Sequence, residues 1–136
     1  MQIRNYQDQD FQRLVELLKA TENYYEPLDT RENLKIKIGH DPNSIIVLED
    51  DNKLVGTVFI CYDPWCSFIY HLSVHPNYQK KGLGSKLMDE AEKRLKEAGI
   101  RRPTLFVTEK NQQVIEFYKK RGWSVMGKVF DMEKEL

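Results

Sequence analysis

Hydrophobic and polar residues alternate along the chain with two different periods, and each change of period marks a predicted change of element. Apolar residues recur at helical spacing near the start, at strand spacing in the middle, and in both ways later in the chain. The first half is therefore predicted to hold a strand at 2–6, helices at 9–20 and 30–38, a hairpin with strands at 45–48 and 54–62, and a strand at 68–74.

The second half is predicted to alternate helices with short strands. Five apolar residues define one face of a helix that Gly99 ends: Leu83, Leu87, Ala91, Leu95 and Ala98. After it we expect a buried strand at 105–107, a helix between Asn111 and Gly122, and strands at 123–125 and 129–132. Helical crossovers joined to an antiparallel meander predict an α/β (α+β) fold with a mixed sheet covered by helices.

The connection between the strand at 68–74 and the following helix has the composition of an anion-binding turn. It reads Gln79-Lys80-Lys81-Gly82-Leu83-Gly84. Glycines allow close backbone approach and positive φ, so successive N–H groups can converge on one point. The unpaired N–H groups and the dipole of the helix favour a phosphate at the same place. A tight turn with a solvated lysine cluster is the alternative interpretation.

Composition and charge restrict the class of protein. The 136 residues suffice for one domain, 1–136, and the balance of 21 basic and 21 acidic residues leaves no overall field to attract nucleic acid. No apolar run has the length of a signal peptide core or a membrane span. Cys61 and Cys66 form a poor zinc signature, so buried free thiols and no metal are predicted. We expect a cytoplasmic protein that binds neither membranes nor nucleic acid.

Two motifs in this order resemble the GNAT superfamily of acetyl-coenzyme A dependent N-acetyltransferases, over essentially the full chain. The first is the family's Q/R-x-x-G-x-G/A loop, here Gln79 to Gly84, which follows Val74-His75-Pro76. The second is the family's N-x-x-x-x-x-F-Y-x-x-x-G-F/W segment, here Asn111 to Trp123. The chain is most similar to small single-domain bacterial members, including the YpeA type. The resemblance implies a mixed sheet of six to seven strands with a splayed central pair and helices on both faces.

The resemblance also implies acetyl-coenzyme A as the acyl donor. In relatives the loop N–H groups hold the pyrophosphate, and the backbone of the splayed strand meets the pantetheine arm. Asn111 would lie near that arm, and it is also in position to cap a helix. The predicted cofactor-binding residues are Leu72, Ser73, Val74, Gln79, Lys80, Lys81, Gly82, Leu83, Gly84, Ser85, Asn111 and Tyr118.

For catalysis the resemblance implies direct attack of a primary amine on the thioester. Tyr118 resembles the general acid that returns a proton to the departing thiolate, although a core tyrosine is the alternative. Many relatives carry a glutamate or histidines on the substrate-facing strands, where this chain has Phe68, Tyr70 and Phe106. Strand alternation predicts that His71 points away from the face of Tyr70. We therefore expect Tyr70 to act through water as the base, with Glu109 and Glu26 as alternatives.

The identity of the amine stays open between a small molecule and a protein N-terminus or lysine. The loop 21–29 is either a surface connection or a wall of the amine site. As a wall, Glu22, Glu26 and Asp29 would attract a cation, and Tyr24 and Tyr25 would stack on it.

Alternative functions are weighed against the same motifs. A non-catalytic acyl-coenzyme A sensor or regulatory subunit is the main alternative, favoured by the missing carboxylate base and opposed by the intact second motif. A P-loop hydrolase and a Rossmann domain fail because their glycine patterns are absent. The C-terminal strands would leave an edge open to a second copy, so a monomer or homodimer is expected.

Overall fold

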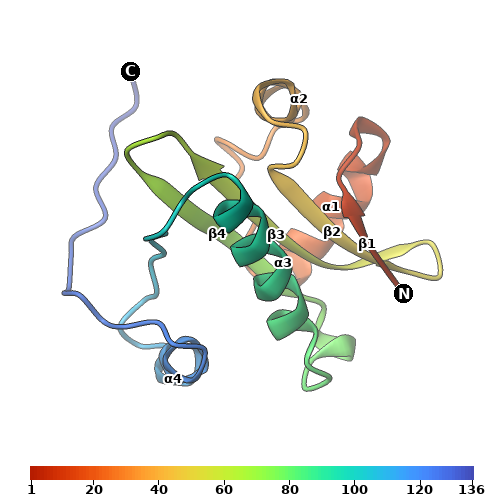
Figure 1. The fold of residues 1–136 in the computed structure, drawn as a ribbon. Helices are drawn as coiled ribbons and strands as arrows, with labels where there is room; N and C mark the ends of the chain where they lie inside the picture. The colour runs from red at the N-terminus through yellow and green to blue at the C-terminus, as the bar shows by residue number, and fades with distance from the viewer. The chain divides into compact units, whose positions relative to one another are not determined.

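Four antiparallel strands form the sheet of this protein (Figure 1). The computed structural model describes residues 1–136, and the chain divides into a unit of Met1–Leu105 and a unit of Phe106–Leu136. All strands belong to the first unit: β1 (Gln2–Asn5), β2 (Ile45–Asp50), β3 (Lys53–Tyr62) and β4 (Ser67–Val74), paired in that order. The predicted hairpin and the strands predicted at 2–6 and 68–74 are confirmed.

Helices cover both faces of this sheet, as predicted. On one face α1 (Phe11–Ala20) and α2 (Arg31–His40) pack on a core that contains Leu14, Leu17, Leu18, Leu34, Ile45, Val47 and Phe59. The opposite face is covered by α3 (Leu83–Glu97), which crosses the sheet in front of the strands (Figure 1). Because side chains of a strand alternate, β2 supplies Ile45 and Val47 to the first face and turns Leu48 toward α3.

The buried face of α3 follows the predicted helical period. Its buried residues are Leu83, Leu87, Met88, Ala91 and Leu95. Ala98 was predicted to belong to this face, but it lies beyond the last helical residue and is exposed. Gly99 has φ +86°, the left-handed conformation that ends the helix. Periodicity therefore identifies the face but extends it by one turn too many.

The start of each N-terminal helix is fixed by a different polar group. Thr30 caps α2 as predicted, because its Oγ1 accepts a hydrogen bond of 3.1 Å from the N–H of Asn33. At α1, the fully buried Asp10 accepts from the N–H of Gln7 and from the guanidinium groups of Arg4 and Arg13. The carboxylate thus ties β1 to the first turn of α1.

The strands predicted after α3 do not form. Thr104 makes a single parallel bridge with Phe68, through its N–H to Ser67 O (3.0 Å) and its carbonyl to Ile69 N–H (2.9 Å). The segments 105–107 and 121–136 contain no strand, so the sheet has four strands instead of six or seven. A segment of three or four residues can have the alternating apolar pattern of a strand although no neighbouring segment pairs with its backbone. The pattern alone therefore does not ensure that a strand forms. The splayed pair was predicted between β4 and the strand after α3. Within Met1–Leu105, the bridge between Phe68 and Thr104 is the one pairing of this kind that forms.

The remaining predictions for the chain concern its second unit, its cysteines and membranes. Helix α4 (Gln112–Lys120) is confirmed, and Gly122 follows it with φ +93°. Cys61 and Cys66 are free thiols, but Cys61 is exposed because it lies near the end of β3, beyond the core. No helix combines the length and the apolar character needed to cross a membrane.

Candidate functional site

The loop between β4 and α3 enters the helix through two residues in the left-handed conformation. Lys80 has φ +63°, and Gly82, the N-cap of α3, has φ +76°. The first helical hydrogen bond runs from Lys86 N–H to Gly82 O (3.1 Å). The N–H groups of the first turn, at residues 83–85, therefore have no carbonyl partner within the helix. Together with the helix dipole they give this end of α3 a local positive potential.

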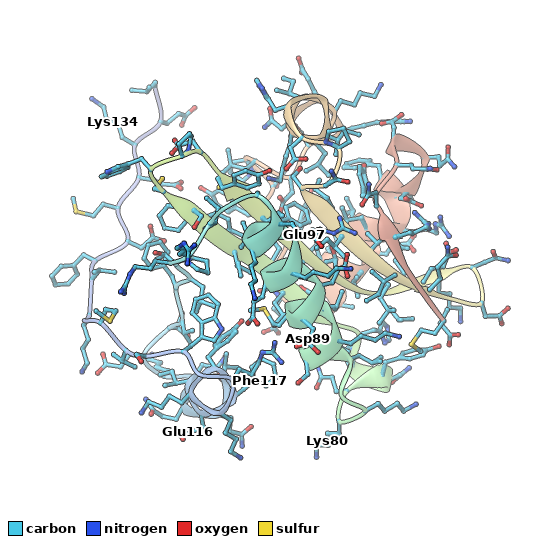
Figure 2. The ribbon with its side chains drawn as sticks, in the orientation of Figure 1. Lys80, Asp89, Glu97, Glu116, Phe117 and Lys134 are labelled. Carbon is cyan, nitrogen blue, oxygen red and sulfur yellow. The ribbon has the colours of Figure 1, made fainter.

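Side chains of the same loop tie it to β4 and surround it with positive charge. Gln79 Nε2 donates to Val74 O (3.1 Å), at the last residue of β4. Between them the turn η2 (Pro76–Tyr78) is held by His75 Nδ1, which accepts from Asn77 N–H (3.1 Å). The ammonium group of Lys81 lies 5.3 Å from the centre of the Tyr78 ring. Lys80 lies on the loop that leads into α3 (Figure 2).

Near the C-terminal end of β4, two residues direct their backbone N–H and C=O groups away from β3. His75 N–H donates to Val55 O of β3 (2.8 Å), and Ser73 is the register partner of Thr57. Since backbone groups alternate between the two sides of a strand, Leu72 and Val74 direct theirs away from β3. The carbonyls of both residues accept side-chain hydrogen bonds, from Asn23 (3.3 Å) and Gln79. Val74 thereby contacts the loop that precedes α3, and Leu72 contacts the connection between α1 and α2.

A bulge at His71 sets this register and corrects the predicted orientation of its side chain. β4 carries one extra residue between the pairs Phe59↔Tyr70 and Thr57↔Ser73, and His71 has φ +54°. The imidazole packs edge-on against Phe59, with ring centres 4.9 Å apart. Phe59 is directly opposite Tyr70, so Tyr70 and His71 share one face of the sheet. The prediction that His71 points to the other face is therefore wrong.

Side chains of the connection between α1 and α2 form hydrogen bonds with residues of β4. Asn23 Nδ2 donates to Ser73 Oγ (2.7 Å), and His71 Nε2 lies 3.0 Å from both carboxylate oxygens of Asp29. Asp29 is only 4% exposed, so it is not part of a solvated acidic loop. Glu22 and Glu26 are exposed, and Tyr24 carries the ammonium group of Lys19 5.1 Å from its ring centre. Neither the role of Asn23 nor the Asp29–His71 pair could be predicted from the sequence, since the partners are remote along the chain.

Tyr70 presents an accessible phenol on that face. Its side chain is 43% exposed, and its ring stacks on Phe68 with centres 5.7 Å apart. The use of Tyr70 as a base that acts through water stays a prediction.

In the second unit the residues of the second motif form a compact turn around Tyr118. Tyr118 is 9% exposed and contacts the rings of Phe117 (5.1 Å) and Trp123 (6.0 Å). Its carbonyl accepts from Trp123 N–H (3.0 Å), which closes the end of α4. Asn111 occupies the N-cap position, but its side chain makes no capping hydrogen bond. Glu109, an alternative base, is paired with Lys128 at 2.6 Å.

Comparisons with known proteins agree with this architecture. The sequence profile of the acetyltransferase (GNAT) family matches residues 6–123. An acetyltransferase of Sodalis glossinidius is 29% identical over 136 residues, covering 100% of this chain and 96% of the relative. An acetyltransferase of Yersinia pestis is 32% identical over 120 residues, covering 88% of this chain and 85% of the relative.

A solved structure extends the likeness to three dimensions. The PaiA N-acetyltransferase from Thermoplasma acidophilum, in complex with coenzyme A, is 25% identical with a TM-score of 0.79, over 91% of this chain and 89% of that one. The chain belongs to the acetyltransferase (GNAT) family. It is an acyltransferase, and enzymes of this family use acetyl-coenzyme A.

Proposed function

We propose that this protein is an N-acetyltransferase that moves an acetyl group from acetyl-coenzyme A to a primary amine by direct attack. The observation that carries the proposal is the loop 79–85, where Gly82 starts α3 in the left-handed conformation and the next three N–H groups have no helical partner. A pyrophosphate at this loop would meet backbone donors, the helix dipole and the ammonium groups of Lys80 and Lys81.

The outward groups of β4 suit the pantetheine arm of the same cofactor. Leu72 and Val74 direct N–H groups outward, and each carbonyl has a second lone pair beside the bond from Asn23 or Gln79, so an amide-rich chain can pair with them as an added strand would. Ser73 supports this arrangement from behind, because its hydroxyl accepts from Asn23 and its backbone lies in register with β3. Leu83, Gly84 and Ser85 would meet the phosphates, and Asn111, whose side chain does not cap α4, is proposed to contact the arm.

The chemical step needs a neutral amine and a stabilised oxyanion. Tyr70 is proposed to hold a water molecule that receives a proton from the substrate ammonium group. The amine nitrogen then attacks the thioester carbon, whose oxygen gains negative charge and is proposed to accept a hydrogen bond from Leu72 N–H. When the C–S bond breaks, Tyr118 is proposed to give its proton to the coenzyme A thiolate. The amine is a small molecule or a protein amine.

A non-catalytic acyl-coenzyme A sensor is the second candidate, because β4 itself contributes no carboxylate to the face that presents Phe68 and Tyr70. The two functions are separated by incubating the protein with acetyl-coenzyme A and a panel of amines, while free thiol is recorded and acetylated amine is identified by mass. Amine-dependent thiol release together with an acetylated product supports the enzyme. Binding of acetyl-coenzyme A without either product, across small amines and peptides, supports the sensor.

A further inference from the structure

The pair formed by His71 and Asp29 has the geometry of an oriented imidazole. Nε2 of His71 faces both oxygens of Asp29 at 3.0 Å, and Tyr25 N–H donates to Asp29 Oδ2 (2.8 Å). A carboxylate in this position keeps the ring proton on Nε2, because only an N–H can donate to it. The lone pair of the neutral ring then lies on Nδ1, the nitrogen directed away from Asp29.

Burial separates the two partners into an accessible group and a protected one. Asp29 is buried, whereas the side chain of His71 is 22% exposed. The bulge also places the imidazole on the same face as the exposed phenol of Tyr70, because His71 contacts Phe59 and Phe59 is the register partner of Tyr70. Asp29 from the α1–α2 connection is the titratable group in contact with the ring, and Phe59 from β3 brings no charge.

We propose that His71 is the group that finally takes the proton of the substrate ammonium, with Asp29 as its positioning residue. The inference rests on the proposed acetyl transfer and supplies the base that this transfer needs. A phenol keeps its own proton near neutral pH, so Tyr70 can orient a water molecule but cannot store the proton. Nδ1 of the imidazole carries a lone pair when Nε2 donates to Asp29, so it can accept the proton.

The protons balance over one turnover. The substrate ammonium loses its first proton through water to His71 Nδ1, and its nitrogen lone pair forms the new C–N bond. The C–S electrons leave with sulfur, and the thiolate takes the phenolic proton of Tyr118. The nitrogen then loses a second proton, which restores Tyr118, while His71 releases its proton to solvent. The products are the acetamide, coenzyme A and one free proton.

The test uses variants that separate proton transfer from folding. His71→Asn keeps a side-chain amide that can donate to Asp29, and His71→Gly suits the positive φ at this position and leaves space for a free imidazole. We expect kcat/KM for the amine to fall about 100-fold in both variants, with the Kd for coenzyme A unchanged. Added imidazole should restore His71→Gly by about tenfold or more, which a purely structural role of the ring would not predict.

Two further variants complete the comparison. In Asp29→Asn the amide can donate to Nε2 and move the ring proton to Nδ1, so a loss of about tenfold or more is expected. His40→Asn changes an exposed histidine of α2 and should leave activity intact.

Near-normal turnover of folded His71→Asn, or a His71→Gly variant that imidazole does not restore, would overturn the role of His71 while leaving acetyl transfer established. A wild type that binds coenzyme A but acetylates no amine would instead overturn the proposed transfer, and this inference with it.

Discussion

Gln79 Nε2 donates a hydrogen bond of 3.1 Å to the carbonyl of Val74, the last residue of β4. The bond holds the start of the anion-binding loop against the strand whose outward groups are proposed to meet the pantetheine arm. One side chain thus links the two parts of the proposed cofactor site that lie in Met1–Leu105.

Removing this bond should weaken cofactor binding without unfolding the protein. A hydrogen bond contributes about 0.5–1.5 kcal/mol, so Gln79→Ala is expected to raise the Kd for coenzyme A by up to about tenfold in calorimetry. Asn77→Ala changes an exposed residue of the same loop and should bind as the wild type does. Equal Kd values for the two variants would show that the bond does not position the loop.

Tyr118→Phe tests the proposed general acid. Loss of the hydroxyl should lower kcat about 100-fold and change the KM for acetyl-coenzyme A little, because the proton is needed only when the thiolate departs. Tyr6→Phe is a matched control, since Tyr6 is also a buried tyrosine. A Tyr118→Phe enzyme as fast as Tyr6→Phe would assign Tyr118 to packing.

The ionisation of Asp10 makes the stability of the protein depend on pH. Burial alone would raise the pKa of Asp10, but hydrogen bonds from Arg4, from Gln7 N–H and from Arg13 outweigh it, so this pKa lies below its ordinary value. Its contribution is present above the unfolded-state pKa of about 4 and is lost as the pH falls through the lower folded-state value.

Asp10→Asn should therefore destabilise the protein by about 3 kcal/mol near neutral pH, because it leaves Arg4 without its buried partner. The deficit in urea unfolding should shrink as the pH falls below about 4. Asp8→Asn, which removes an exposed ion pair with Arg31, should have little effect. A deficit that persists unchanged in acid would mean that the carboxylate charge is not its source.

A substitution at Gly56 tests how closely α3 approaches the sheet. A Cβ atom at this residue would lie 2.8 Å from Leu87 Cδ1, so Gly56→Ala is expected to lower the free energy of unfolding by about 1–3 kcal/mol. Combining it with Leu87→Ala should cost less than the sum of the two single changes, because the second substitution removes the clash. Strict additivity in urea unfolding would contradict the contact.

The sequence predicted those parts of the fold that depend on local pattern. The apolar period of α3, the cap at Thr30 and the hairpin of β2 and β3 each follow from neighbouring residues, and the structure has all three. The left-handed start of α3 at Gly82 could be predicted for the same reason, since only glycine adopts that conformation without strain.

Features that depend on distant partners could not be predicted in this way. Alternation assigned His71 to the wrong face because one inserted residue in β4 shifts every side chain after it. Asp29 was expected either in a surface connection or in a wall of the amine site, and neither expectation included its pairing with His71, which is remote in sequence. The strands proposed at 123–125 and 129–132 had suitable residues but no partner that their sequence could specify.

The most direct test of the account is calorimetric titration of acetyl-coenzyme A, and of non-reacting desulfo-coenzyme A, into the wild type and Gly84→Trp. Gly84 lies in the first turn of α3, where an indole would cover the N–H groups proposed to hold the pyrophosphate. Gly39→Trp is the matched control, because a side chain at Gly39 meets open space. The account predicts binding by the wild type and Gly39→Trp and none by folded Gly84→Trp. Binding by folded Gly84→Trp with the wild-type Kd would contradict it.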